Sequence, residues 1–148
     1  MARTNAPISG TDLGVYTGSG TKTLLGLATN CSITFNRDMR DVSNKDSAGW
    51  KAMLTGQKNW QISCEGLYNP SSTNGYIALY NAWLAGTLLT LTFGANINGT
   101  NPTVQDYYWV GTAYITSLQQ QAPNEGNVTW SVTFQGTGAI AMTDPLLQ

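Results

Sequence analysis

Small or apolar residues alternate with polar residues along several stretches of the chain. The pattern is clearest in residues 58–68 and recurs in residues 106–121 and 127–138. Because successive side chains of a β-strand point to opposite faces, a period of two predicts strands with one buried face. The positions expected to face the core are Trp60, Ile62, Cys64, Gly66, Trp109, Gly111, Ala113, Ile115, Val128, Trp130, Val132 and Phe134.

Two further stretches, residues 22–36 and 87–94, are rich in Thr, Leu and Ile and predict additional strands. Residues 74–86 instead show a helical spacing of large apolar side chains that ends at a glycine. We expect these side chains to pack into the core as one stripe; they are Ile77, Tyr80, Trp83 and Leu84.

Residues 1–21 are rich in Gly, Thr, Ser and Asn and show no sustained period, which favours a flexible or partner-ordered arm. Residues 37–58 form a polar, glycine-punctuated excursion whose flanks could pair as a hairpin. The expected fold is mainly β: an antiparallel β-sandwich or barrel with one α-helix packed against it, an extended N-terminal arm and a long inter-strand loop. At 148 residues the chain has the size of one domain, residues 1–148.

Positive charge is concentrated in the loop. Only 10% of the residues are charged, yet five of the seven Lys and Arg residues lie between Arg37 and Lys58. Residues 59–148 contain four acidic residues and no base. A surface without Lys or Arg does not grip phosphates, so specific nucleic-acid binding by this part is excluded.

The composition also argues against catalysis. The chain has no histidine, which removes serine and cysteine triads and the usual metal sites. The segment "GSGTKT" departs from a phosphate-binding loop because Thr21 interrupts the Gly-Lys-Thr order, and a pair such as Glu65 with Asp106 has no supporting pattern. We therefore expect no enzyme activity and no cofactor.

The two cysteines, Cys31 and Cys64, are too few for a disulfide scaffold, and free buried thiols are favoured over a bridge. No apolar run is long enough for a membrane span, and residues 1–14 lack the apolar core of a signal peptide, so neither is expected. Without secretion, three glycosylation sequons, at Asn30, Asn98 and Asn127, are expected to be coincidental.

The segment "DVSNKDSAGWKAMLTGQKNWQISCEGLY" resembles the signature region of the phage major tail proteins, the tail tube proteins of long-tailed phages and related particles. In that family a strand leads into a Ser, Lys/Asp, Ser, Gly, Trp cluster, and a Gly-x-x-x-Trp turn leads into the next strand. The helix "YIALYNAWLAG" and the closing strand "GNVTWSVTFQGTG" follow in the family's order, so the resemblance covers roughly residues 22–140. The matching positions of the central cluster are Ser43, Lys45, Asp46, Ser47, Gly49, Trp50, Gly56, Trp60, Ser63, Gly66 and Tyr68.

The resemblance implies a structural virion protein whose hexameric rings stack into the hollow tail tube through which phage DNA leaves. It implies contacts with copies of itself and with tail tip or baseplate, tape measure and tail terminator proteins, without specific DNA binding or membrane association. It also implies synthesis in the bacterial cytoplasm and a final location in the virion tail. Because the family's excursion reaches a neighbouring ring, the expected ring-stacking residues are Arg37, Arg40, Lys45, Asp46, Ser47, Trp50, Lys51, Met53 and Lys58.

A wall that passes DNA should carry little positive charge, since each cationic contact to a phosphate would slow the polymer. The polar strand faces expected to line the lumen are Gln61, Ser63, Glu65, Thr129, Ser131 and Thr133. Two alternatives remain open at this stage. Five Trp and seven Tyr residues could form the sugar-binding platform of a carbohydrate-binding β-sandwich, and the inner tube of a contractile injection system has a similar fold.

Overall fold

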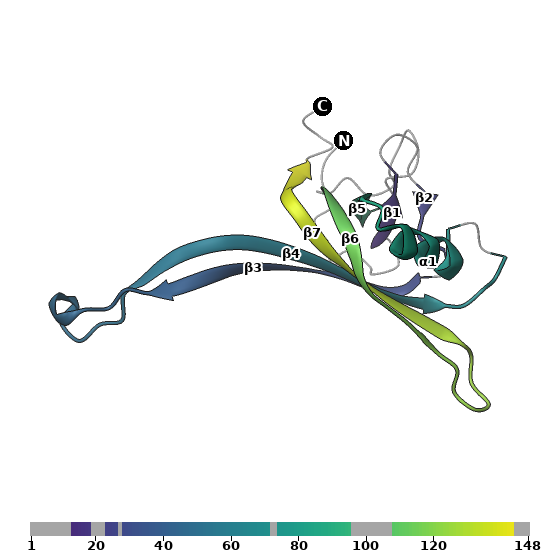
Figure 1. The fold of residues 1–148 in the computed structure, drawn as a ribbon, viewed down its shortest axis with the longest axis horizontal. Coiled ribbons are helices and arrows are strands. Elements are labelled where there is room, and N and C mark those ends of the chain that lie inside the picture. The colour runs from purple at the N-terminus through teal and green to yellow at the C-terminus, as the bar shows by residue number, and fades with distance from the viewer. Residues whose placement is uncertain (1–12, 19–22, 27, 72–73, 96–107, 144–148) are drawn as a thin grey trace, which may run out of the picture.

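The computed structural model describes residues 13–18, 23–26, 28–71, 74–95 and 108–143 of the 148-residue chain (Figure 1). In this part, seven strands and one α-helix follow each other along the chain, and a short 3-10 turn, Lys45–Ser47, joins β3 to β4. The elements are β1 (Leu13–Thr17), β2 (Thr23–Leu24), β3 (Ala28–Asp41), β4 (Met53–Leu67), α1 (Tyr76–Ala85), β5 (Leu89–Ala95), β6 (Tyr108–Gln121) and β7 (Thr129–Thr143).

The strands form one antiparallel sheet in the order β2-β1-β5-β6-β7-β4-β3. The sheet curls, because β1, near one end of this order, contacts β3 at the other end. The prediction of a mainly β, antiparallel fold with one packed helix is therefore confirmed. Strands β3 and β4 run far beyond the rest of the sheet and give the molecule its elongated shape (Figure 1).

The core lies on one face of this curled sheet. The alternating positions predicted for β4 and β7 face it, and β5, β6, β1 and α1 add the remaining buried side chains. The core residues are Val15, Leu25, Trp60, Ile62, Cys64, Leu79, Leu91, Phe93, Ala113, Ile115, Trp130, Val132 and Phe134.

Trp60 closes the core where the long hairpin leaves the sheet. Its ring lies directly on two glycines: a Cβ at Gly136 would be 2.1 Å from the indole, and one at Gly111 would be 2.6 Å away. Its Nε1–H donates a hydrogen bond to the carbonyl oxygen of Gly138 at 3.2 Å. The two glycines therefore leave the space that the indole fills, which explains their place in strands that otherwise disfavour glycine.

The helix was predicted with correct bounds to within two residues but with the wrong face inward. Leu79 is its one fully buried residue, whereas Ile77, Tyr80, Trp83 and Leu84 are all more than two-fifths exposed. The expected core stripe instead lies on the outer surface of the subunit, although Tyr80 and Trp83 still contact each other, with ring centroids 6.0 Å apart.

Two further expectations require correction. Residues 13–17 belong to the sheet as β1, so the proposed N-terminal arm over residues 1–21 is wrong for this part; residues 1–12 and 19–21 lie outside the described residues. The long inter-strand loop, residues 37–58, is only half irregular: residues 37–41 and 53–58 are paired strand, as the possible hairpin required, and residues 42–52 form the tip. The sequence of these two strands shows no alternation of apolar and polar residues, because the hairpin buries neither face there.

Candidate functional site

The first candidate surface is the projecting part of the β3–β4 hairpin, residues 37–58, which we call the arm (Figure 1). Strand β7 pairs with β4 only from Gln61 to Leu67, so the arm is a two-stranded ribbon that extends past the sheet. All of its residues are exposed except Ser47 and Ala52. An isolated two-stranded ribbon is marginally stable in water, which suits a segment that gains contacts from a partner.

Five cations line the arm: Arg37, Arg40, Lys45, Lys51 and Lys58. Arg37 and Lys58 lie directly opposite one another on the paired strands. Like charges in this position repel, and within the described part of the chain none of the five cations forms an ion pair. The arm therefore presents unpaired positive charge together with exposed apolar side chains, namely Met39, Val42, Trp50, Met53 and Leu54.

The tip of the arm is held by its own polar side chains. Ser43 Oγ accepts a hydrogen bond from Ala52 N at 2.7 Å, and Asn44 Oδ1 accepts one from Asp46 N at 2.9 Å. Ser47 Oγ accepts a hydrogen bond from Asn44 N at 3.1 Å and completes a capping box. Ser47, predicted as a contact residue, thus also shapes the turn through its side chain.

This turn displays Trp50, which is 81% exposed, the most exposed large hydrophobic residue in the described part of the chain. The chain reverses through Ala48 and Gly49, both with positive φ, and Trp50 N donates to Ser47 O at 2.8 Å. At the foot of the tip, hydrogen bonds from the Ser43 side chain and backbone lower the pKa of Asp41. The indole is therefore presented on an ordered turn.

The second candidate surface is the sheet face opposite the core, which we call the polar sheet face. All six residues predicted to line a lumen lie on it, and cross-strand pairs join them: Ser63 with Thr133, and Glu65 with Ser131. The face continues onto β3 and β6 and further along β7 through polar residues that the sequence analysis did not single out, and these residues are Asn30, Ser32, Thr34, Ser117, Gln119, Gln121 and Gln135. Glu65 is the one charged side chain among these thirteen residues.

The sequence could have revealed the additional residues on β3 but not those on β6. The β3 residues alternate with Cys31, Ile33 and Phe35, so their period of two was visible. On β6 a register shift between Ile115 and Ser117 reverses the alternation, which moves Gln119 and Gln121 to the polar sheet face. Such a bulge is not evident from a simple alternation of residue types.

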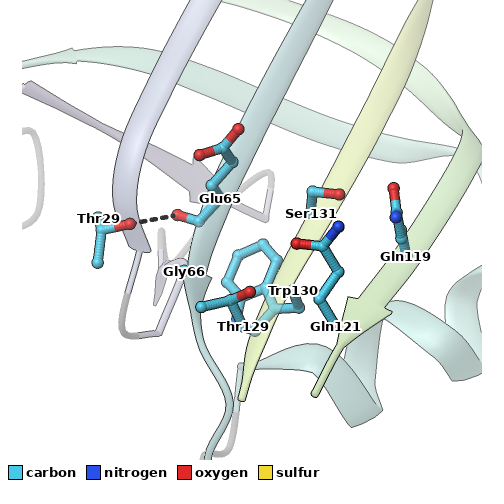
Figure 2. Close-up of a pocket in the computed structure, with 8 residues that line it drawn as sticks. All are labelled: Thr29, Glu65, Gly66, Gln119, Gln121, Thr129, Trp130 and Ser131. Carbon is cyan, nitrogen blue, oxygen red and sulfur yellow. Dashed lines mark hydrogen bonds between the residues drawn. The ribbon is translucent and has the colours of Figure 1, made fainter. Parts of the chain in front are cut away.

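A shallow hollow of about 240 Å³ opens at one end of the polar sheet face (Figure 2). Residues from β3, β4, β6 and β7 line it: Thr29, Glu65, Gly66, Gln119, Gln121, Thr129, Trp130 and Ser131. Thr29 Oγ1 donates to Glu65 O at 3.4 Å across it. Its single carboxylate offers no set of metal ligands, and no group of three or more such ligands occurs among the described residues.

None of the described helices is long and apolar enough to cross a membrane. The arm extends from β3 and β4, which are two of the four strands that carry the polar sheet face, and the described residues of neither surface bring together nucleophile, acid and base. The geometry thus defines a class of protein, a β-rich subunit with a projecting arm and a polar sheet face on which Glu65 is the one charged residue.

A sequence model described as "Phage tail tube protein" matches residues 10–142. The chain therefore belongs to the phage tail tube protein family, and it is a structural protein of the virion tail. A comparison with curated protein sequences gives no significant match.

Solved structures of tails share the fold. A chain in the tail of an empty gene transfer agent particle, refined with helical C6 symmetry, superposes with a TM-score of 0.76 at 20% identity, covering 93% of this chain and 99% of that one. The SPP1 tail tube subunit gives a TM-score of 0.72 at 16% identity, covering 93% and 80%. A chain of the anti-feeding prophage baseplate gives 0.65 at 10% identity, covering 95% and 98%.

Proposed function

We propose that the subunit forms hexameric rings that stack into a hollow tube, and that phage DNA passes through this tube during ejection. The observation that carries the proposal is the polar sheet face, which spans four neighbouring strands with Glu65 as its one charged residue. Most side chains of this face are hydroxyls and amides, which hydrate well and hold no phosphate, as the lining of a DNA conduit requires.

In this arrangement the arm is the ring-stacking element. It projects beyond the body of the subunit, and its exposed side chains combine an aromatic anchor with cations (Figure 1). Aromatic anchors supply binding energy, whereas charges fix the register of a contact. The remainder of the chain is the matching surface: the arm carries five bases and three acids, a net charge of +2, and the other residues carry two bases and five acids, a net charge of −3.

Electron microscopy of negatively stained protein tests the whole proposal. Fresh and aged samples of the full chain should show rings or hollow tubes with sixfold end views. A protein that stays monomeric at all concentrations, and whose tryptophan fluorescence shifts with glycans, would instead support the carbohydrate-binding alternative. In this fold Trp60 and Trp130 are buried, so these two residues cannot contribute to such a platform. A sheath gene next to the gene for this protein would indicate that the tube belongs to a contractile system.

We expect lysines on the polar sheet face to make the tube bind DNA. Tubes of a Ser131→Lys/Thr133→Lys variant should retain at least about tenfold more short DNA at low salt than unmodified tubes, and added salt should release it, because each lysine adds a phosphate contact. Co-sedimentation of tubes with labelled DNA measures the effect.

The control for this variant is Asn124→Lys, which adds a lysine at the exposed turn between β6 and β7. If both variants bind DNA equally, the polar sheet face does not line the lumen, although tube formation itself would stand.

The exposed face of α1 supports a second contact between copies of the chain. The helix carries no charged residue, and the side of it that packs on β6 is not the side that holds Trp83 and Leu84, which are 46% and 67% exposed. An uncharged apolar face of this kind on a subunit of a tube is best explained by a neighbouring copy that covers it. We assign this face to subunit contact, in place of the core role that its spacing predicted.

A Trp83→Ser/Leu84→Ser variant is expected to stay folded and to lose assembly, because both side chains are exposed in the single subunit. Circular dichroism and sedimentation measure the two properties. Asn81→Ser, an exposed change on the same helix, is the control. Normal tubes from the double serine variant would show that this face is not an interface.

A further inference from the structure

The two cysteines lie directly opposite one another. Cys31 of β3 and Cys64 of β4 are register partners, so their side chains are on the same, core-facing side of the ladder. Both thiols are free; Cys64 is fully buried, whereas Cys31 is half-buried. Opposed residues of antiparallel strands have Cα and Cβ spacings close to those of a disulfide.

The two sulfurs also influence each other. A hydrogen bond from the Cys64 thiol lowers the pKa of Cys31, and the backbone N–H of Val15 lowers it further, against the effect of burial. The same interaction with Cys31, together with burial and the charge of the Cys31 thiolate, raises the pKa of Cys64. The pair is thus asymmetric: Cys31 is half-buried and its pKa is lowered, whereas Cys64 is buried and its pKa is raised.

We propose that Cys31 and Cys64 form an oxidation site, in which a peroxide converts the two thiols into one intrachain disulfide across β3 and β4. The inference is independent of tube formation, because both residues lie within one subunit. It rests on their register, on the partial exposure of Cys31 and on the burial of Cys64 beside it.

The chemistry balances with one peroxide. The Cys31 thiolate attacks a peroxide oxygen, the O–O bond breaks, and hydroxide leaves and is protonated to water, so that Cys31 becomes a sulfenic acid. The Cys64 sulfur then attacks the Cys31 sulfur, the S–O bond breaks, and the departing hydroxide takes the Cys64 proton. Two thiols lose two electrons and two protons in total, and the peroxide becomes two waters. After the first step the Cys31 thiolate no longer opposes ionisation of Cys64, which favours the second step.

The position of the bond gives it a mechanical role. The pair sits at the root of the hairpin, inside the part of β4 that β7 also pairs, and next to β1 where the curled sheet returns to β3. A covalent link there would fix the two strands that extend into the arm. Because it would close a segment of more than thirty residues, it should also constrain the unfolded chain.

Treatment of the purified, reduced full chain with hydrogen peroxide tests the inference. We expect both titratable thiols to disappear together, the intact mass to fall by two hydrogens, and a single cross-linked peptide to join Cys31 to Cys64. The thermal midpoint should rise by on the order of 10 °C and return after reduction. Oxidation to sulfinic acid, disulfides only between chains, or an unchanged midpoint with both thiols intact would each overturn the proposal.

A matched variant tests whether the disulfide depends on the two cysteines being register partners on one face, and not only on their being close in the sheet. Ser63→Cys/Cys64→Ser keeps two cysteines but moves one to the polar sheet face, the other side of the same strand. This variant should form no intrachain bridge and should stop at the Cys31 sulfenic acid, which dimedone traps. If the variant fails to fold, Cys31→Ser in the unaltered background serves instead, and we expect the buried Cys64 to react at least about tenfold more slowly with peroxide than the intact pair. An equal rate of reaction would show that Cys31 does not start the chemistry.

Discussion

Replacement of Trp50 by alanine is expected to impair tube formation strongly while leaving the subunit folded. The indole is 81% exposed at the tip of the arm, so its removal should change the free energy of unfolding by no more than about 0.5 kcal/mol. An aromatic anchor in an interface contributes about 2 kcal/mol or more, so the concentration needed for assembly should rise about thirtyfold. Sedimentation across a concentration series measures this change.

Reversal of charge at the neighbouring residue should act in the same direction. Lys51→Glu is expected to leave the fold unchanged and to impair polymerisation, with a defect that weakens as salt is added, because screening reduces the new repulsion. Asn44→Asp is an unsuitable control because Asn44 shapes the turn; Gln57→Glu, on the flank of the arm, adds negative charge without touching the tip. Tubes of normal length and yield from Trp50→Ala or Lys51→Glu would remove the assembly role assigned to the arm.

Replacement of Trp60 by alanine, in contrast to that of Trp50, is expected to destabilise the fold itself. The free energy of unfolding should fall by about 3–5 kcal/mol. The side chain is 3% exposed, packs on two glycines and donates a hydrogen bond to Gly138. Deletion of the ring would leave a cavity in the core and remove the hydrogen bond to the Gly138 carbonyl group. Urea unfolding followed by circular dichroism measures the loss, and Trp50→Ala is the matched control, since it makes the same chemical change at an exposed site.

The fit between Trp60 and Gly136 can be tested separately. Gly136→Ala should cost about 1–3 kcal/mol, because its methyl group would occupy space that the indole fills. In a Trp60→Ala background the same change should cost much less, since the obstructing ring is gone. Additive effects of the two substitutions would show that the glycine matters for its backbone and not for its contact with the ring.

The sequence predicted those parts of the fold in which one face is buried. The alternation through Trp60, Ile62 and Cys64, and through Trp130, Val132 and Phe134, marks β4 and β7 because each slip of one residue would expose the large side chains. The helix could be located but not oriented. Apolar residues lie all round α1, so its sequence does not specify a unique inward face, and packing selected Leu79.

The sequence predicted which charged and aromatic residues the arm contains, but it did not predict that the arm is a regular two-stranded ribbon. The charged segment, residues 37–58, coincides with the arm, and Trp50 was identified in it. No alternation of apolar and polar residues predicted regular strands there. The ladder between β3 and β4 simply continues outward from a buried beginning, which is tertiary information. The polar sheet face was half identified, because the β6 bulge conceals Gln119 and Gln121 from a reading based on a period of two.

The two-stranded form of the arm has a further consequence for the single subunit. Among the described residues, no third strand pairs with either side of the ribbon beyond Gln61, so both of its edges offer unpaired N–H and C=O groups. Such edges invite uncontrolled pairing between molecules and can lead to fibrillar aggregates. The opposed Arg37 and Lys58, together with the register shift beside them, interrupt and charge these edges. We therefore expect the unpaired cations of the arm also to oppose edge-to-edge pairing between unassembled subunits.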